Sequence, residues 1–271
     1  MPGTKRQHEL ARRRAERQAA RRRELAARKR KQRFIVAGSG IGLLVLIVGI
    51  FIVVKNTKDD NKKAKAAAAA ASAAATPSRT PKPVACGATA PTAAKPQKFA
   101  AAPPMTIDAT KKYNATIKTS CGDVVVELLA DKAPTTVNSF SFLASKKFFD
   151  GTRCHRLLTG ADSVVQCGDP TATGRGGPGY TFKDENLPTA TGDSFTYPAG
   201  TVAMANGGPS TNGSQFFFVV KDSPFPPDYT IVGHVTTGQD VLDKLLAVGQ
   251  TEGTDEPAQD MYVESLTVAA S

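Results

Sequence analysis

The sequence is poor in the residues that most often bind metals. Its 271 residues include four cysteines, none of them in a CxxC pair, and only three histidines, His8, His155 and His234. Structural zinc sites combine closely spaced Cys and His ligands, so we expect no metal. Tryptophan is absent altogether, which excludes any binding site that depends on an indole ring.

Acidic residues are scarce only in the N-terminal part. Residues 1–33 hold 14 Lys/Arg against three Asp/Glu, whereas residues 111–271 hold 12 basic and 18 acidic residues, a net charge of −6. Nucleic-acid affinity depends on neutralising phosphates. We therefore expect no nucleic-acid binding by the C-terminal domain, although such a role for the basic tail remains an alternative.

Charge is missing entirely from residues 34–54, which are 21 predominantly apolar residues. As a helix this segment would span about 31 Å, enough for a bilayer core. A cleaved signal peptide, the alternative, has a shorter basic region and apolar core. We expect an uncleaved single-pass anchor, with the basic tail of residues 1–33 in the cytoplasm, where it can touch anionic lipid.

Hydrophobic periodicity is absent from residues 55–110, which contain a run of six alanines and many prolines. Such composition cannot build a core. It predicts a linker without regular structure, which would hold the domain formed by residues 111–271 outside the membrane.

Residues 111–271 show short alternating segments with two helical patterns, residues 134–144 and 239–248. Eight short strands and two separated helices predict a mainly β fold, a closed eight-stranded antiparallel barrel capped by the helices. The expected strands are residues 113–119, 124–128, 154–158, 164–167, 201–205, 215–220, 229–235 and 261–268.

Residues 200–220 place a polar loop of Asn, Gly, Pro, Ser and Thr between two apolar strands. Turn residues held by stiff strands can present backbone groups to an extended peptide. A plain hairpin in a β-rich core is the alternative, and the stretch alone does not decide between them.

Six motifs in order make residues 113–268 resemble the cyclophilins: residues 155–156 (HR), 166–169 (QCGD), 174–177 (GRGG), 182–186 (FKDEN), 204–206 (MAN) and 212–217 (NGSQFF). The tail, anchor and linker look like those of membrane-anchored actinobacterial members. The resemblance implies a monomeric peptidyl-prolyl cis-trans isomerase that needs no cofactor and acts on proline-containing segments of exported proteins.

The resemblance also implies roles for individual residues. Arg156 matches the catalytic arginine, Gln166 a residue that orients it, and Phe217 the floor of the proline pocket. The matching substrate-binding positions are Val164, Ala205, Asn206, Gly207, Gln215, Phe225 and Tyr229.

Some positions depart from the family pattern. Two extra residues separate Arg156 from Gln166, which puts Ser163 and Val164 where relatives carry a pocket phenylalanine and methionine. The family's tryptophan is also missing, so we expect weak inhibition by cyclosporin. A non-catalytic peptide-binding or chaperone module on the same fold therefore remains the alternative function.

An even number of cysteines in a domain outside the membrane suggests disulfides. Cys154 and Cys167 fall on strands expected to be adjacent, within bridging distance, which leaves Cys86 to pair with Cys121. A nucleophilic pair of Cys154 and His155 is not expected, because adjacent strand residues point to opposite faces.

Overall fold

The computed structural model describes residues 80–190 and 192–271. The predicted tail, the predicted anchor and the first part of the predicted linker lie outside these residues. Within the described ranges, no helix is both long and apolar enough to cross a membrane.

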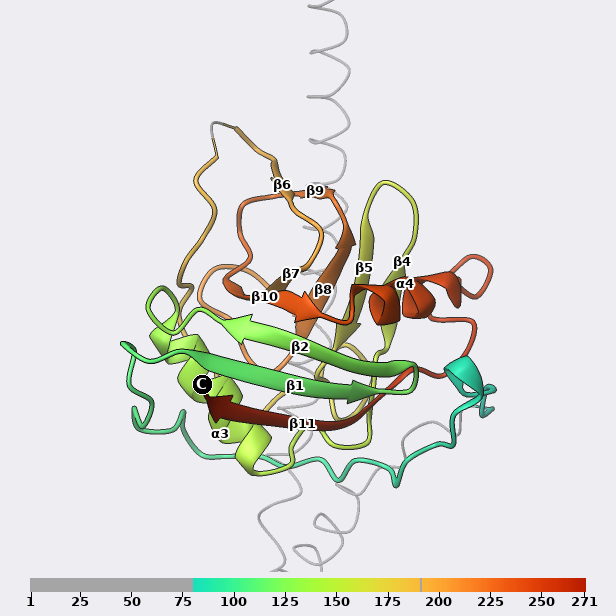
Figure 1. The fold of residues 1–271 in the computed structure, drawn as a ribbon, viewed down its shortest axis with the longest axis horizontal. Coiled ribbons are helices and arrows are strands. Elements are labelled where there is room, and N and C mark those ends of the chain that lie inside the picture. The colour runs from blue at the N-terminus through green and yellow to red at the C-terminus, as the bar shows by residue number, and fades with distance from the viewer. Residues whose placement is uncertain (1–79, 191) are drawn as a thin grey trace, which may run out of the picture. The chain divides into compact units, whose positions relative to one another are not determined.

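The described chain is mainly β, with two α-helices and one short 3-10 helix (Figure 1). In chain order the elements are η1 (Ala85–Gly87), β1 (Tyr113–Thr119), β2 (Gly122–Leu128), α3 (Pro134–Ser145), β3 (Thr152–Arg153), β4 (Arg156–Leu158), β5 (Ser163–Cys167), β6 (Phe195–Tyr197), β7 (Thr201–Met204), β8 (Phe216–Lys221), β9 (Ser223–Phe225), β10 (Ile231–Thr237), α4 (Gln239–Ala247) and β11 (Tyr262–Ala270).

The main sheet has nine antiparallel strands in the order β3-β11-β1-β2-β10-β7-β8-β5-β4. The expectation of a closed eight-stranded barrel is therefore wrong, since the sheet is a curled half-barrel. Its edge strands β3 and β4 follow each other in the chain but do not pair. The amide of Leu157 in β4 instead donates to the carbonyl of Asp255, 2.8 Å away, in the loop after α4. That loop occupies the edge that β3 would need for closure.

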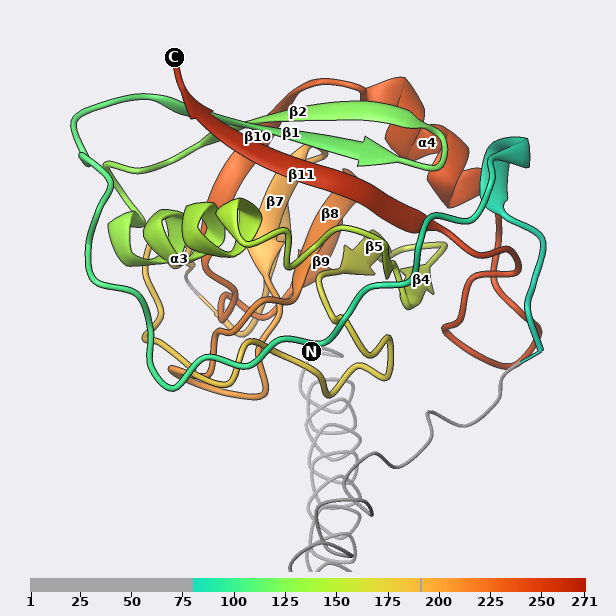
Figure 2. The ribbon, with the colours of Figure 1, turned by 90° about the horizontal axis from the view of Figure 1, so that it is seen from below.

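The interior is divided by strand alternation in β8. Phe216 and Phe218 lie in the main core, whereas Phe217 belongs to a smaller cluster with Val164 and Tyr197. Alternation along the strand therefore puts the outer two phenylalanines on one face and Phe217 on the other. Helices α3 and α4 lie at opposite ends of the curled sheet (Figures 1 and 2). The apolar side chains that they bury include Val137, Phe140, Leu143, Val241, Leu242 and Leu245.

A second, two-stranded sheet joins β6 to β9, and the sequence did not predict it. Three prolines in the segment after β8 favour a loop, but proline is tolerated in short edge strands. The pairing puts Phe195 opposite Phe225 and Tyr197 opposite Ser223. This sheet therefore delivers aromatic side chains to the smaller cluster around Phe217.

Residues 80–112, here called the N-terminal strap, run along the outside of the domain (Figure 2). Composition predicts a linker over most of this segment, up to residue 110. Its contacts are tertiary: the ring of Phe99 meets that of Phe142 at 5.0 Å between centroids, and the amide of Thr106 donates to Asn138 at 2.9 Å. Composition alone does not reveal such contacts, because each involves a residue far along the chain.

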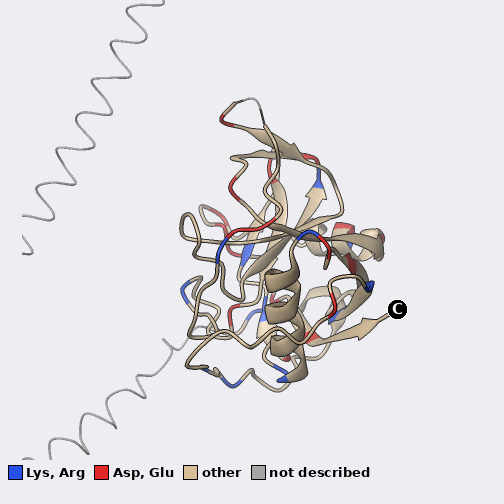
Figure 3. Ribbon diagram, turned by 90° about the vertical axis from the view of Figure 1, so that its left-hand side faces the viewer, with Lys and Arg blue, Asp and Glu red and all other residues tan. Residues whose placement is uncertain are grey.

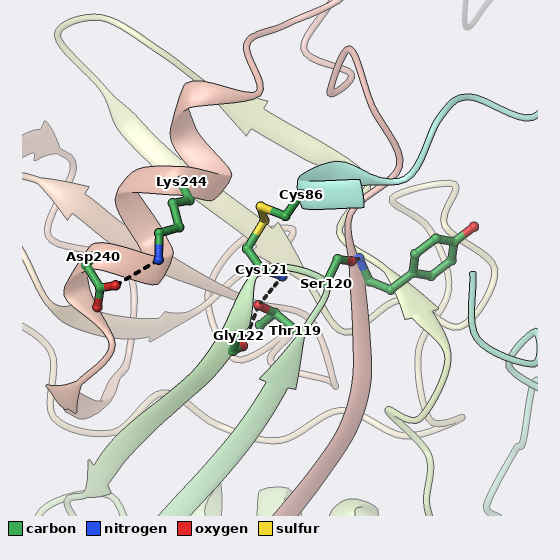
Figure 4. The surroundings of a disulfide bond; sticks show 8 residues. Cys86, Thr119, Ser120, Cys121, Gly122, Asp240 and Lys244 are labelled. Atoms are coloured by element: carbon green, nitrogen blue, oxygen red, sulfur yellow. Dashed lines mark hydrogen bonds and ion pairs between the residues drawn. A yellow bond between two sulfur atoms is a disulfide. The ribbon is translucent and has the colours of Figure 1, made fainter. Parts of the chain in front are cut away.

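Both expected disulfides are confirmed. Cys86 of the strap is bonded to Cys121 at the β1–β2 turn (Figure 4), with 5.3 Å between Cα atoms. Cys154 is bonded to Cys167 with 4.0 Å between Cα atoms. Cys154 lies just before β4 rather than within a strand, so the pairing was predicted correctly but its strand placement was not.

Basic and acidic residues are interspersed along the described ribbon in the view of Figure 3.

Candidate functional site

Strand register brings the three predicted catalytic residues into one row. Arg156 on β4 lies opposite Gln166 on β5, and Gln166 lies opposite Phe217 on β8. Directly opposed residues on neighbouring strands project to the same face. Positions 61 residues apart in the chain therefore meet across three strands at the open edge of the sheet.

The row opens into a cavity of about 450 Å³, here called the aromatic cavity. Phe217 is 5% exposed and forms part of its lining. Its ring lies 6.0 Å from that of Phe225 and 5.4 Å from that of Tyr229, between centroids. The predicted residues that line this cavity are Arg156, Val164, Gln166, Ala205, Asn206, Phe217, Phe225 and Tyr229.

A second cavity of about 630 Å³ adjoins the first, and we call it the glycine-loop cavity. It contains the two remaining predicted residues, Gly207 and Gln215. Both cavities are lined by Gln166, Gly174, Ala205 and Asn206. They therefore form one continuous groove.

A chain of polar contacts fixes the wall of this groove. The Arg156 Nε donates to Asp255 at 3.0 Å, and its Nη1 lies 3.5 Å from the Gln166 Oε1. Gln166 donates to the Gln215 Oε1 at 2.9 Å, and Gln215 donates to the carbonyl of Gly176 at 2.9 Å. The amide orientations of both glutamines are thus set by their neighbours, which leaves little freedom for rearrangement on binding.

The side chain of Asp169 holds the loop of residues 168–179 in place through hydrogen bonds. It is fully buried and accepts hydrogen bonds from Thr171, Thr173 and the amide of Gly176. Burial alone would raise its pKa, but these hydrogen bonds outweigh burial and hold the pKa below its usual value. A Cβ at position 176 would lie 1.8 Å from the Asp169 carboxylate, so only glycine fits there.

His155 lies beside the row, with its Nε2 3.5 Å from the Gln166 Nε2. Burial is the main cause that lowers the pKa of His155, while the nearby Asp169 carboxylate partly opposes this effect. The imidazole is therefore neutral at pH 7, which leaves Arg156 as the cation of the row.

Tyr197 supports the aromatic wall from behind. Its hydroxyl donates to the carbonyl of Pro226 at 3.1 Å and accepts from the amide of Tyr229 at 3.2 Å. Burial raises the pKa of Tyr197 to about 12. The hydroxyl thus stays protonated and ties the segment that carries Phe225 and Tyr229 to β6.

The departures noted in the sequence have different outcomes. Val164 lines the aromatic cavity, but Ser163 is buried away from it, with its amide donating to Ser223 at 2.9 Å. Position 163 therefore contributes no aromatic ring to the aromatic cavity. Phe225 and Tyr229, with centroids 6.1 Å apart, supply the aromatic wall instead.

Sequence reasoning missed several residues of the groove. Asp255 and Glu256 line the aromatic cavity, yet Asp255 is 99 positions from the arginine that it contacts. They belong to an irregular loop without a recognisable motif. Ala172 and Thr173 also line the cavity, and the neighbouring glycine motif was the one signal that pointed to them.

In the described ranges, no group of three or more His, Cys, Asp or Glu side chains could hold a metal ion. The sulfur of Cys154 is bonded to Cys167 and is therefore not a nucleophile. What the groove offers is a cation, amide groups and an aromatic floor.

A groove on a curled antiparallel sheet defines a mainly β domain with a surface binding site, and similarity to known proteins specifies the family. Residues 114–268, more than half of the chain, match the family described as cyclophilin type peptidyl-prolyl cis-trans isomerase/CLD. The chain belongs to this family.

Relatives share the domain but differ in length. The chain is 44% identical over 168 residues to a probable peptidyl-prolyl cis-trans isomerase B of Mycobacterium leprae, a match that covers 56% of each chain. It is 39% identical over 172 residues to peptidyl-prolyl cis-trans isomerase B of Streptomyces anulatus, covering 57% of this chain and 95% of the relative. The match thus spans about half the length of the mycobacterial isomerase B relatives.

A solved structure supports the fold. The crystal structure of a Cryptosporidium parvum cyclophilin-type peptidyl-prolyl cis-trans isomerase superposes with a TM-score of 0.51 at 26% identity. The similarity covers 59% of this chain and 99% of the other.

Proposed function

We propose that this chain is a peptidyl-prolyl cis-trans isomerase whose groove binds an X-Pro segment and accelerates rotation about its peptide bond. Rotation faces a barrier of about 18–20 kcal/mol, because it breaks the resonance of the amide. No covalent bond breaks, so the site need only bind the twisted amide more tightly than either planar form.

The observation that carries this proposal is the placement of Arg156 at the rim of an aromatic-floored cavity. A twisted amide regains a lone pair on the proline nitrogen, and a guanidinium N–H can donate to it. Asp255 takes the Nε proton and Gln166 contacts Nη1. The other N–H groups of the guanidinium donate to no further partner among the described residues, and they are the donors that we assign to the substrate.

The rest of the groove holds the two sides of the bond. Phe217, Phe225 and Tyr229 form an apolar surface that suits a proline ring. The loop that follows β7, together with Gln166 and Gln215, offers polar groups to the peptide backbone. A related Cryptosporidium parvum isomerase was crystallised in the presence of the dipeptide Ala-Pro, which supports a proline-containing ligand for this groove.

The cellular setting is also part of the proposal. Residues 34–54 would anchor the chain in the cell membrane, the basic tail would lie in the cytoplasm against anionic lipid, and the domain would act as a monomer on exported proteins. Two disulfides support an oxidising compartment for the domain. Protease added to intact cells should digest a tag at the C-terminus but not one at the N-terminus.

The test of catalysis compares Arg156→Ala with the unchanged full-length chain in two assays, isomerisation of an Ala-Pro peptide and affinity for the same peptide. We expect kcat/KM to fall about 10- to 100-fold, since a charge-assisted hydrogen bond contributes about 1.5–3 kcal/mol. Affinity should change far less. Equal isomerisation rates for the two proteins would favour the alternative, a non-catalytic peptide-binding module.

A further inference from the structure

The glycine-loop cavity is partly built by a segment that precedes the family domain. The family match begins at residue 114, yet Lys98 of the N-terminal strap lines this cavity. Its ammonium donates to the carbonyl of Gly177, 2.7 Å away. One of the three ammonium protons suffices for this contact, which leaves the others for a ligand in the groove.

The strap is held closely at this point. The amide of Phe99 donates to the carbonyl of Pro178 at 2.7 Å, and the ring of Phe99 packs on Phe142. Gly179 has φ +100, and a Cβ there would lie 2.7 Å from the carbonyl oxygen of Phe99. The backbone beside Lys98 is therefore fixed against the loop of residues 168–179, and the position of its side chain is built into the groove.

The two cavities differ in charge. The glycine-loop cavity has two cationic side chains in its lining, Lys98 and Arg175, and no carboxylate. The aromatic cavity has Asp255 and Glu256 beside Arg156. Among the described residues, neither Lys98 nor Arg175 belongs to an ion pair. The groove is thus cationic at one end and mixed at the other.

Carboxylates near the glycine-loop cavity are already engaged. Asp169 is buried and accepts hydrogen bonds from Thr171, Thr173 and the amide of Gly176. Asp184 accepts from the amide of Ser210 and from Asn212, and it does not line the cavity. Neither therefore lies between the two cations and a peptide in the groove.

We propose that Lys98 is a specificity-determining residue that selects X-Pro segments with an acidic side chain facing the glycine-loop cavity. The inference rests on the proposed function, because it assumes that the proline occupies the aromatic cavity. In an extended peptide, residues two positions apart point to the same side and lie about 7 Å apart. An acidic residue that points to the same side of the extended peptide as the proline is thus the kind expected to face Lys98.

The experiment uses the full-length chain and peptides with one Glu, Gln or Lys at each of three positions on either side of an Ala-Pro pair. We expect kcat/KM for the Glu peptide to exceed that for the Gln peptide by about two- to five-fold at one position, the size of an exposed ion pair. The excess should shrink in 0.5 M NaCl.

Variants test whether Lys98 causes the preference for Glu over Gln. Lys98→Gln should reduce the Glu/Gln ratio and Lys98→Glu should bring it below one, whereas Lys95→Gln, on the same strap but outside the cavity lining, should leave it unchanged. An identical ratio in Lys98→Gln and the unchanged chain would overturn the inference. If the unchanged chain fails to isomerise the all-neutral peptide, the proposed function fails. The same ratios measured as Kd by fluorescence titration then decide the role of Lys98 independently.

Discussion

The guanidinium of Arg156 is anchored at one end and available at the other. Its contact with Asp255 is partly exposed, with 43% and 54% of the two side chains accessible, so its direct contribution to stability is small. Its effect is orientational, because fixing Nε restricts where the remaining N–H groups can point. Sequence motifs indicated the arginine, but its acidic partner depends on how a distant loop packs.

Replacing Asp255 by Asn should lower kcat about two- to five-fold and leave peptide affinity almost unchanged, because the variant removes the charge that aligns Arg156 without touching the apolar floor. Asp255→Glu should restore part of the lost rate. Asp243→Asn, an exposed position on α4, is the control. An unchanged kcat in Asp255→Asn would show that the contact does not position the arginine.

His155 makes folding sensitive to mild acid. Its pKa in the folded chain is below its ordinary value of 6.5, chiefly because of burial, so the unfolded chain binds more protons as the pH falls below 6.5. By linkage, the free energy of unfolding should decrease as the pH is lowered from about 7.5 to 5. Urea denaturation across this range measures the slope. His155→Gln should flatten it, whereas His234→Gln, which removes an exposed histidine, should not.

At the scale of elements, patterns of alternation and turn residues predicted much of the sheet. The β1 strand spans the residues expected from alternation, and α3 begins at Pro134, where proline favours a first turn. Strands β6 and β9 were missed because each has only three residues and β9 contains Pro224. Their pairing depends on tertiary context, and local sequence carries little trace of it.

The packing of the strap also could not be predicted from its local sequence. Its few apolar residues show no period, yet Ala85 is fully buried and Phe99 packs on the helix. These strap residues are buried because they pack against the surface of the domain, and the sequence of the strap shows no hydrophobic period that would indicate it.

The junction of strap and glycine loop predicts a specific sensitivity. Gly179→Ala should destabilise the chain by more than about 1 kcal/mol, because the residue has positive φ and the new methyl group would meet the backbone of Phe99. This corresponds to a fall in Tm of at least about 2–4 °C. Gly177→Ala is the matched control, since a Cβ there has no atom within 4 Å. Equal Tm values for both variants would show that the strap does not pack at this point.

At the scale of the whole molecule, the two disulfides fasten different segments of the chain. Cys86–Cys121 closes 35 residues and ties the strap to the first hairpin, whereas Cys154–Cys167 closes 13 residues near the groove. In the chain-entropy model these loops correspond to about 4 and 3 kcal/mol. The bonds differ in exposure, because Cys86 is exposed while Cys154 and Cys167 are buried.

Mild reductant should therefore open Cys86–Cys121 first. Alkylation of newly freed thiols followed by mass spectrometry should label Cys86 and Cys121 before Cys154 and Cys167, and thermal stability should fall in the same step. Denatured protein provides the control in which all four thiols react together. Simultaneous labelling of all four in the native chain would contradict the exposures given above.

We propose that the groove of this cyclophilin-family chain accelerates the cis-trans isomerisation of X-Pro bonds. Exchange spectroscopy by NMR tests it most directly, with the full-length chain added in catalytic amounts to an Ala-Pro peptide. Without enzyme the isomers interconvert in tens to hundreds of seconds. We predict cis–trans exchange cross-peaks within a mixing time of about one second, and their loss on replacing Arg156 by Ala. A peptide that binds, as judged by shifted resonances, but shows no exchange cross-peaks would contradict the account.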